Sequence, residues 1–195
     1  MTKKLLILPA LVLVGGGAFF MASSRAAYET ARYDVLSTQG DMELRRYAPM
    51  VLATTALGPE DRDNGFGRLF RFISGANEAK QKIAMTTPVF MPSSAKGEIQ
   101  TMQFVLPADV GTSGAPKPTA SNVTLESRPG GVFAALRFRG YGSREKQQKA
   151  LETLLAWIKT SGRSTKGDPI FAYYDPPWTP EFLRRNEVLI EVTEP

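Results

Sequence analysis

The chain has 195 residues, which is long enough for one domain with a sizeable core and too short for two ordinary domains. Its net charge is +5. Without the three basic residues of the first 27 positions, the chain has 21 basic and 19 acidic residues, which gives a net charge of +2. Neither this charge nor any run of basic residues indicates a nucleic-acid partner. The absence of histidine and cysteine excludes disulfides, thiolate metal sites and histidine-dependent catalysis. No Asp/Glu cluster has the spacing of a metal site. The composition therefore indicates a binding protein and not an enzyme.

Residues 1–27 have the pattern of a targeting segment. Lys3 and Lys4 precede an uncharged, mostly apolar run of 18 residues at positions 5–22, and the small residues around Arg25 predict cleavage before Ala27. The same run is near the shortest length that spans a membrane, so an uncleaved anchor in the inner membrane is the alternative. Both interpretations predict a periplasmic or otherwise extracytoplasmic domain over residues 28–195.

The first half of this domain contains five strand signals and one helix signal. Alternating and β-branched residues predict strands at 33–37, 42–47, 51–57, 83–91 and 99–106. After the third strand, apolar residues recur at helical spacing, which predicts one short helix ended by Ser74 and Gly75. The core stripe predicted for this helix consists of Phe66, Leu69, Phe70 and Ile73.

Phe72 breaks the pattern of this helix. It lies roughly 120° from the predicted core stripe and beside Arg68, with Arg71 further round the helix. One interpretation is that Phe72 packs under a loop. The other is that it forms an apolar floor with cationic edges for a flat, acidic ligand.

The second half repeats the same order of elements. Residues 107–121 are rich in Pro, Gly and Ser and predict a surface loop or hinge. Strands follow at 122–127, 132–139, 169–174 and 187–192, with a helix at 143–160 between the second and third of them. The core stripe of that helix is predicted to consist of Leu151, Leu154, Leu155 and Ile158. Two such halves joined edge to edge predict an α+β fold, a distorted antiparallel β-barrel with two flanking helices.

Two further stretches bear on ligand binding. Met85 is either a soft, adaptable wall residue of a pocket or a filler of the core. Three prolines stiffen the loop at 173–185, so Trp178 is presented with little conformational freedom left to lose. Arg184 follows at the base of this loop, and an aromatic ring beside a guanidinium suits a planar molecule that carries carboxylates. Alternatively, Tyr174 and Trp178 cover the end of the barrel.

The chain resembles the SOUL haem-binding protein family in three segments, which in order are LFRFISGAN, KIAMTTPV and YYDPPWTPEFLRRNEV. The resemblance extends from about position 33 to position 192 and implies the same distorted barrel with two helices. It also implies a tetrapyrrole held in a shallow apolar cleft between the first helix and the late loop. The contacts implied in this sequence are Arg68, Arg71, Phe72, Trp178 and Thr179, the last standing where some members have a basic residue.

The predicted function is therefore the binding of haem or a related tetrapyrrole, for carriage, buffering or scavenging. The haem is expected to be non-covalent, and because the chain has no histidine its iron is either unligated by the protein or met by Tyr, Met or Lys. The alternative is a module that binds or senses other flat hydrophobic molecules without iron. We expect a monomer.

Overall fold

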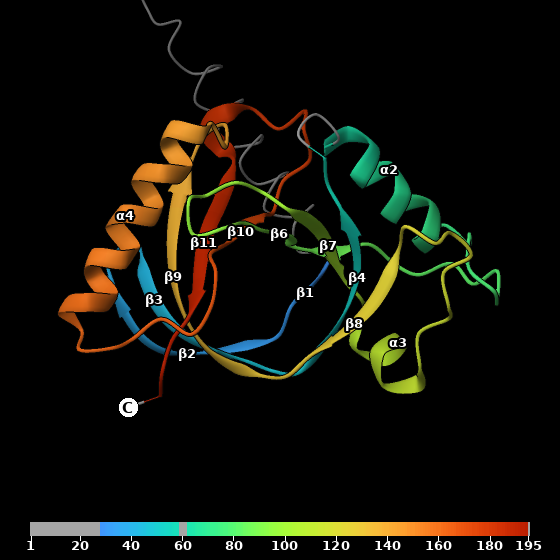
Figure 1. Cartoon of the computed structure of the whole chain (residues 1–195), viewed down its shortest axis with the longest axis horizontal. Helices are drawn as coiled ribbons and strands as arrows, with labels where there is room; N and C mark the ends of the chain where they lie inside the picture. The colour runs from blue at the N-terminus through green and yellow to red at the C-terminus, as the bar shows by residue number, and fades with distance from the viewer. Residues whose placement is uncertain (1–27, 59–61, 195) are drawn as a thin grey trace, which may run out of the picture.

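A curled nine-stranded antiparallel sheet forms the body of the protein (Figure 1). The computed structural model describes residues 28–58 and 62–194, so the predicted leader lies outside the described residues. The strand order is β2-β3-β9-β11-β10-β6-β7-β4-β8. These strands are β2 (Tyr33–Gln39), β3 (Met42–Tyr47), β4 (Met50–Ala56), β6 (Val89–Pro92), β7 (Thr101–Val105), β8 (Thr124–Arg128), β9 (Gly131–Arg139), β10 (Ile170–Tyr173) and β11 (Arg185–Glu191). A separate parallel pair joins β1 (Glu29–Thr30) to β5 (Thr86–Thr87).

The two predicted halves exchange their first strands. In chain order, the halves are β3-β4-α2-β6-β7 and β8-β9-α4-β10-β11. Strand β3 pairs with β9 of the second half and β8 pairs with β4 of the first, while β6 and β10 join the halves in the middle of the sheet. The predicted α+β fold with two repeated halves is therefore confirmed, and the sheet curls into half a barrel with β2 and β8 as its outermost strands.

Two helices cover the outer face of the curl at corresponding positions (Figure 1). Helix α2 (Arg62–Ile73) packs on β4 and β7, and α4 (Arg144–Thr160) packs on β9 and β11. A short helix, α3 (Ala108–Ser113), lies in the stretch that was predicted to be a loop. It packs beside β4, and Val110 is its buried residue. The loop between β10 and β11 contains a 3₁₀ turn, η1 (Glu181–Leu183). No helix in the described part of the chain has both the length and the apolar character needed to cross a membrane.

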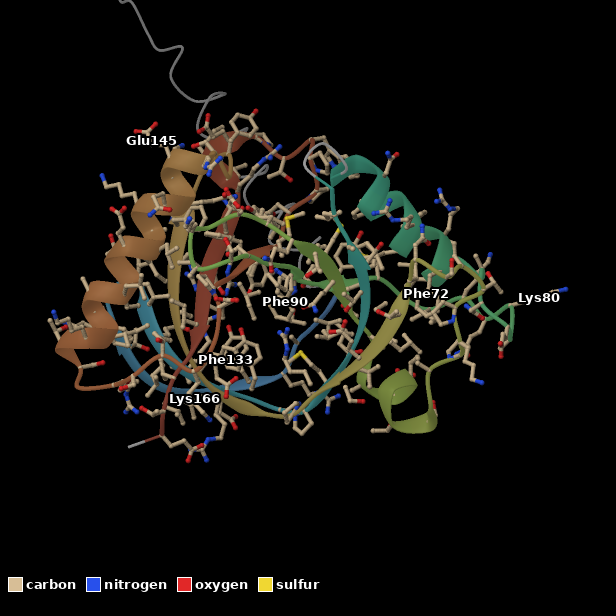
Figure 2. All side chains as sticks on the ribbon, viewed as in Figure 1. Phe72, Lys80, Phe90, Phe133, Glu145 and Lys166 are labelled. Carbon is tan, nitrogen blue, oxygen red and sulfur yellow. The ribbon has the colours of Figure 1, made fainter. Side chains whose placement is uncertain are left out.

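Side chains alternate between the two faces of the sheet, as strand geometry requires. The outer face shares one core with the two helices, and the inner face carries a second core of its own. Figure 2 shows two members of the inner core, Phe90 and Phe133, inside the curl of the sheet. The side chains of the inner face are thus surrounded by the curl of the sheet, and those of the outer face are covered by the helices.

Helix α4 follows most of its prediction. The Ser143 side chain accepts a hydrogen bond from the Lys146 amide at 3.3 Å, which caps the amino end of the helix. Leu151, Leu154 and Ile158 are buried as predicted, whereas Leu155 is exposed. The other flank of the stripe, formed by Gln147 and Ala150, is buried in its place, so the contact face is rotated away from Leu155.

Candidate functional site

The solvent side of α2 carries a pair of stacked aromatic rings. Phe66 and Phe70 lie one turn apart, with ring centroids 5.9 Å apart and planes 14° from parallel. Their exposed fractions are 41% and 50%. The edge of the pair is anchored because Phe66 makes an edge-to-face contact with buried Phe104 of β7 at 5.2 Å. Helix α2 therefore presents a flat apolar surface to solvent.

Phe72 is a core residue, so its predicted position off the core stripe is wrong. Its side chain is 1% exposed and packs with Leu69 and Ile73 in the core between α2 and the sheet (Figure 2). The buried face of the helix is rotated by roughly 60° from the predicted stripe, which leaves Phe66 and Phe70 outside it. The five apolar residues of α2 cover a wide arc, and periodicity alone does not decide which edge of such an arc meets the sheet.

The two arginines predicted as ligand contacts on α2 differ in what they touch. Arg68 donates from Nε to Thr55 Oγ1 at 2.9 Å and from Nη2 to the Ala56 carbonyl at 2.7 Å, which ties the helix to β4. Arg71 is exposed in the last turn of the helix and forms no ion pair with any described residue. Arg71 is therefore the better placed of the two to meet an acidic ligand.

The β10–β11 loop exposes its tryptophan and uses its arginine internally. Trp178 is 81% exposed, whereas Thr179 is buried. Arg184 donates from Nε to the Thr179 carbonyl at 2.7 Å and from Nη2 to the Pro177 carbonyl, and its guanidinium lies 4.4 Å from the ring centroid of Tyr141. These contacts brace the loop. Figure 1 shows this loop and the amino-terminal end of α2 at the same end of the molecule.

Two other predicted contacts, Tyr174 and Met85, belong to the interior. Tyr174 is buried, and its hydroxyl donates to Glu187 Oε2 at 2.8 Å on the inner face of the sheet. Met85 is half-buried and packs against the outer-face core. Of the eight predicted contact residues, Arg71 and Trp178 are the two that are exposed. The structure thus keeps part of the predicted site at the surface and shows the rest engaged within the fold.

A buried cluster of charges surrounds Tyr174. Glu187 accepts hydrogen bonds from Arg45 Nη1 at 2.6 Å and from Arg185 Nη2 at 2.7 Å. Burial acts to raise the pKa of Glu187, but the hydrogen bond and the charges of the two arginines outweigh it and lower this pKa to about 2. Burial likewise acts to lower the pKa of Arg45, and Glu187 raises it overall. In the described part of the chain every buried polar side-chain atom has a hydrogen-bond partner, so this cluster has a structural role and offers no unpaired group to a ligand.

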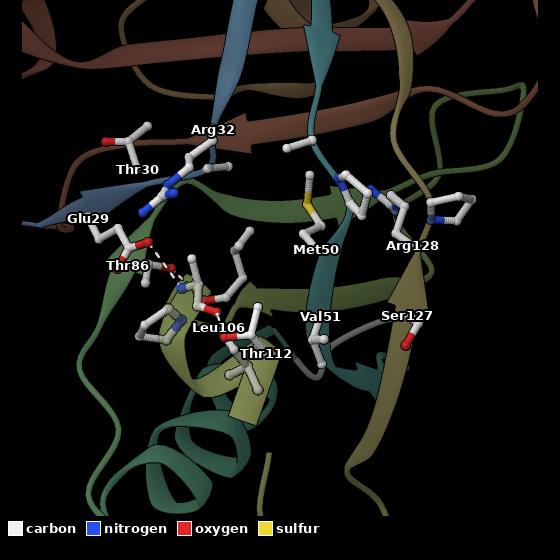
Figure 3. A pocket seen from close by; sticks show the side chains of 18 residues that line it. Glu29, Thr30, Arg32, Met50, Val51, Thr86, Leu106, Thr112, Ser127 and Arg128 are labelled. Carbon is white, nitrogen blue, oxygen red and sulfur yellow. Dashed lines mark hydrogen bonds between the residues drawn. The ribbon is translucent and has the colours of Figure 1, made fainter. Parts of the chain in front are cut away.

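A pocket of about 540 Å³ opens beside α3 (Figure 3). Helix α3 lies at the end of the molecule opposite to the β10–β11 loop (Figure 1). The walls of the pocket come from β1, the start of β4, the end of β8 and the junction between β7 and α3. Sequence reasoning singled out none of its residues as ligand contacts, because five segments spread between Glu29 and Pro129 build it and no motif links them. No group of three or more His, Cys, Asp or Glu side chains in residues 28–58 and 62–194 is arranged to hold a metal ion.

Comparison with known sequences gives one consistent result. The family model described as SOUL heme-binding protein matches residues 28–191. Heme-binding protein 2 from Homo sapiens is 30% identical over 167 residues, covering 80% of this chain and 80% of that protein. Heme-binding protein 2 from Mus musculus is 30% identical over 174 residues, covering 83% of each chain.

Comparison with solved structures supports the fold. The C-terminal domain of EcmrR superposes with a TM-score of 0.60 at 12% identity, covering 84% of this chain and 99% of that domain. A hydrolase from Listeria innocua superposes with a TM-score of 0.57 at 12% identity, covering 81% of this chain and 94% of the hydrolase. At such low identity these similarities concern the architecture alone.

Proposed function

The chain belongs to the SOUL heme-binding protein family, and from this premise we propose that it binds haem or a related tetrapyrrole. The relatives from human and mouse that carry the name Heme-binding protein 2 support this proposal, since the match covers most of each protein. SOUL heme-binding proteins are binding proteins, and the chain contains neither histidine nor cysteine, so no catalytic role is proposed.

The observation that carries the proposal is the exposed, stacked pair Phe66 and Phe70 on α2. A planar macrocycle gains both area burial and stacking energy on such a surface. Arg71 is exposed next to Phe70 in the sequence, and a guanidinium pairs with a propionate through two parallel hydrogen bonds. Trp178 projects from the proline-rich loop at the same end of the molecule and provides a second aromatic surface. In this proposal Phe66 and Phe70 take the role first assigned to Phe72.

The residues present fit the macrocycle and its propionates. The chain has no cysteine for a thioether bond and no histidine for an axial bond, so the haem is non-covalent and its affinity rests on stacking and propionate pairing. Such a complex releases its ligand readily, which suits carriage, buffering or scavenging. The alternative function, binding of other flat hydrophobic molecules without iron, uses the same aromatic surface.

A haem titration followed by absorbance tests this proposal. We expect Phe66→Ala and Phe70→Ala each to weaken haem binding several-fold to about tenfold, since stacking contributes roughly 0.5–1.5 kcal/mol beyond area burial. We expect Arg71→Ala to weaken the binding of haem more than the binding of its dimethyl ester, because only the free acid can pair with a guanidinium. Iron-free protoporphyrin is expected to bind nearly as tightly as haem.

Two control variants separate ligand binding from folding. Leu155→Ala removes an exposed apolar side chain from the other helix, α4, and should leave haem affinity unchanged. Phe72→Ala should lower the free energy of unfolding by about 3–5 kcal/mol, since it empties a core position. If Phe66→Ala, Phe70→Ala and Arg71→Ala all bind haem as the wild type does, the ligand does not bind on α2.

The location proposed for this function is extracytoplasmic. It is supported by the lysines and the apolar run at the start of the chain. Cell fractionation with a protease-accessibility assay tests it, and the mass of the amino terminus distinguishes a cleaved leader from a retained anchor. Recovery of the full-length chain from the cytoplasm would contradict export.

A further inference from the structure

The pocket beside α3 has the dimensions of a small-molecule site. Its volume of about 540 Å³ lies within the range of roughly 300–1,000 Å³ that is usual for ligand pockets. Met50, Val51 and Leu106 give it apolar walls. In Figure 3, Met50 extends into the middle of the pocket and Val51 and Leu106 lie below it. An apolar ligand body can therefore be enclosed on several sides.

Backbone hydrogen bonds hold the walls of this pocket in place. The Ala31 amide donates to the Thr87 carbonyl at 3.0 Å, and the Leu106 amide donates to the Val51 carbonyl at 2.9 Å. Glu29 accepts a hydrogen bond from the Ala108 amide at 3.1 Å, which joins β1 to the start of α3. A pocket that is already formed binds its ligand without losing conformational entropy to order its walls.

Two arginines belong to the pocket lining, on opposite sides of Met50, and the Arg32 guanidinium points towards the Glu29 side and away from Arg128 (Figure 3). Arg32 comes from the segment between β1 and β2, and Arg128 comes from the end of β8 (Figure 3). Neither forms an ion pair with any residue in the described part of the chain. Arg128 is half-buried and donates from Nη2 to the Gln103 side chain at 3.0 Å, with its guanidinium 5.8 Å from the ring centroid of Phe90. Burial lowers the pKa of Arg128 despite the nearby charges of Glu126 and Glu191, so its positive charge is only partly compensated.

The charges of the pocket lining set the charge of the ligand. The lining contains two cations, Arg32 and Arg128, and one anion, Glu29. Because Glu29 is engaged with α3, it lies on the far side from Arg128 and does not neutralise it. A ligand with a single negative charge therefore matches the net charge of the lining residues, and its apolar part matches Met50, Val51 and Leu106.

We propose that this pocket binds a small monocarboxylate with an apolar body, whose carboxylate pairs with Arg128 and whose body packs between Met50 and Leu106. This site is separate from the tetrapyrrole surface on α2, which lies at the other end of the sheet. The proposal does not depend on haem binding, and each can fail without the other.

The test is a calorimetric titration of the full domain with sodium decanoate, below the concentration at which it forms micelles. We expect the wild type to bind decanoate about tenfold or more tightly than decanol, because a hydrogen bond to a charged group contributes roughly 1.5–3 kcal/mol. We expect Arg128→Gln to weaken decanoate binding by a similar factor and to leave decanol binding nearly unchanged. Arg139→Gln, at an exposed arginine on β9, is the matched control and should bind decanoate as the wild type does.

A second variant tests the position of the ligand without touching a charge. Ser127 is exposed at the rim of the pocket on β8, so Ser127→Trp should block entry, abolish decanoate binding and leave the melting temperature and the haem titration unchanged. The proposal is overturned if the wild type does not bind decanoate, if decanol binds as tightly as decanoate, or if Arg128→Gln binds decanoate like the wild type. If Phe70→Ala loses decanoate binding and Ser127→Trp keeps it, the decanoate site lies on α2, and the proposal is also overturned.

Discussion

Two arginines on the inner side of the same curled sheet have opposite electrostatic surroundings. Arg45 of β3 is 1% exposed and contacts two carboxylates, Glu187 at 2.6 Å and Glu43 at 2.7 Å. Arg128 of β8 contacts an amide and an aromatic ring. The pKa of Arg45 is raised and that of Arg128 is lowered, although burial acts to lower both.

The charge of Arg45 is paired within the fold, whereas the charge of Arg128 is available to pair with a bound anion. Removing one member of a closed, buried ion cluster leaves an uncompensated charge, which costs several kcal/mol. Arg128 forms no ion pair with a described carboxylate, and its guanidinium has already been partly desolvated in the free protein. An anion that enters the pocket gains from this preorganisation. Stability should therefore depend strongly on Arg45 and Glu187, and ligand binding should depend on Arg128.

The largest expected effect is that of Glu187→Gln on stability. The substitution leaves buried Arg45 and half-buried Arg185 without their shared carboxylate, so the free energy of unfolding should fall by about 3–5 kcal/mol. Urea denaturation followed by circular dichroism measures it. Glu78→Gln, at an exposed glutamate, serves as the control and should change stability by less than about 0.5 kcal/mol. A loss as small as that of the control would show that the cluster is not a stabilising element.

The next effect is a loss of stability at acid pH. The pKa of Glu187 is about 2 in the folded protein against an ordinary value of 4.5, so its contribution is complete above pH 4.5 and is lost as the pH falls towards 2. The lost contribution is on the order of 3 kcal/mol. Denaturation at pH 6 and at pH 2.5 should show this extra loss in the wild type and not in Glu187→Gln. Parallel pH profiles for the two proteins would assign the acid sensitivity to other carboxylates.

The smallest expected effect is that of Arg128→Gln on stability. This substitution removes a partly uncompensated charge and keeps an amide donor near Gln103, so the free energy of unfolding should stay within about 1 kcal/mol of the wild type. Arg45→Gln provides the comparison and should cost at least three times as much. Equal losses for the two variants would mean that both arginines are structural, and the contrast between them would disappear.

The order of elements along the chain was largely accessible from the sequence. Hairpin signals and the repeated strand–strand–helix–strand–strand pattern predicted the α+β barrel-like fold, because these signals are local. The side of a helix that meets the sheet was less accessible. Periodicity limited the buried face of α2 to a wide arc, and contact with β4 and β7 selected the edge that carries Phe72. The same rotation exposes Leu155 on α4.

The site was less predictable than the fold, for a physical reason. Arg45 and Glu187 are 142 residues apart, and nothing in the local sequence of either predicts their pairing. The pocket likewise depends on strand neighbours that are remote in the chain. Trp178 and Arg71 are exposed and stay predicted ligand contacts. The burial of Thr179 and the internal hydrogen bonds of Arg184 depend on the loop conformation, which the local sequence does not predict.

The exchange of first strands between the halves has a consequence for how the chain folds. Strand β3 has β9 as one of its two partners, and β4 has β8 as one of its two partners, so the first strand of each half is paired only when the other half is present or, for β3, with β2. Such long-range pairs require loop closure before they gain any stabilising contact, which places folding in the slow range of roughly milliseconds to seconds. The pocket takes walls from β4 and from β8, so it forms only after the exchange. A nascent chain interrupted before residue 124 contains α2 and its aromatic surface residues but no pocket, and decanoate binding would therefore report the completion of folding.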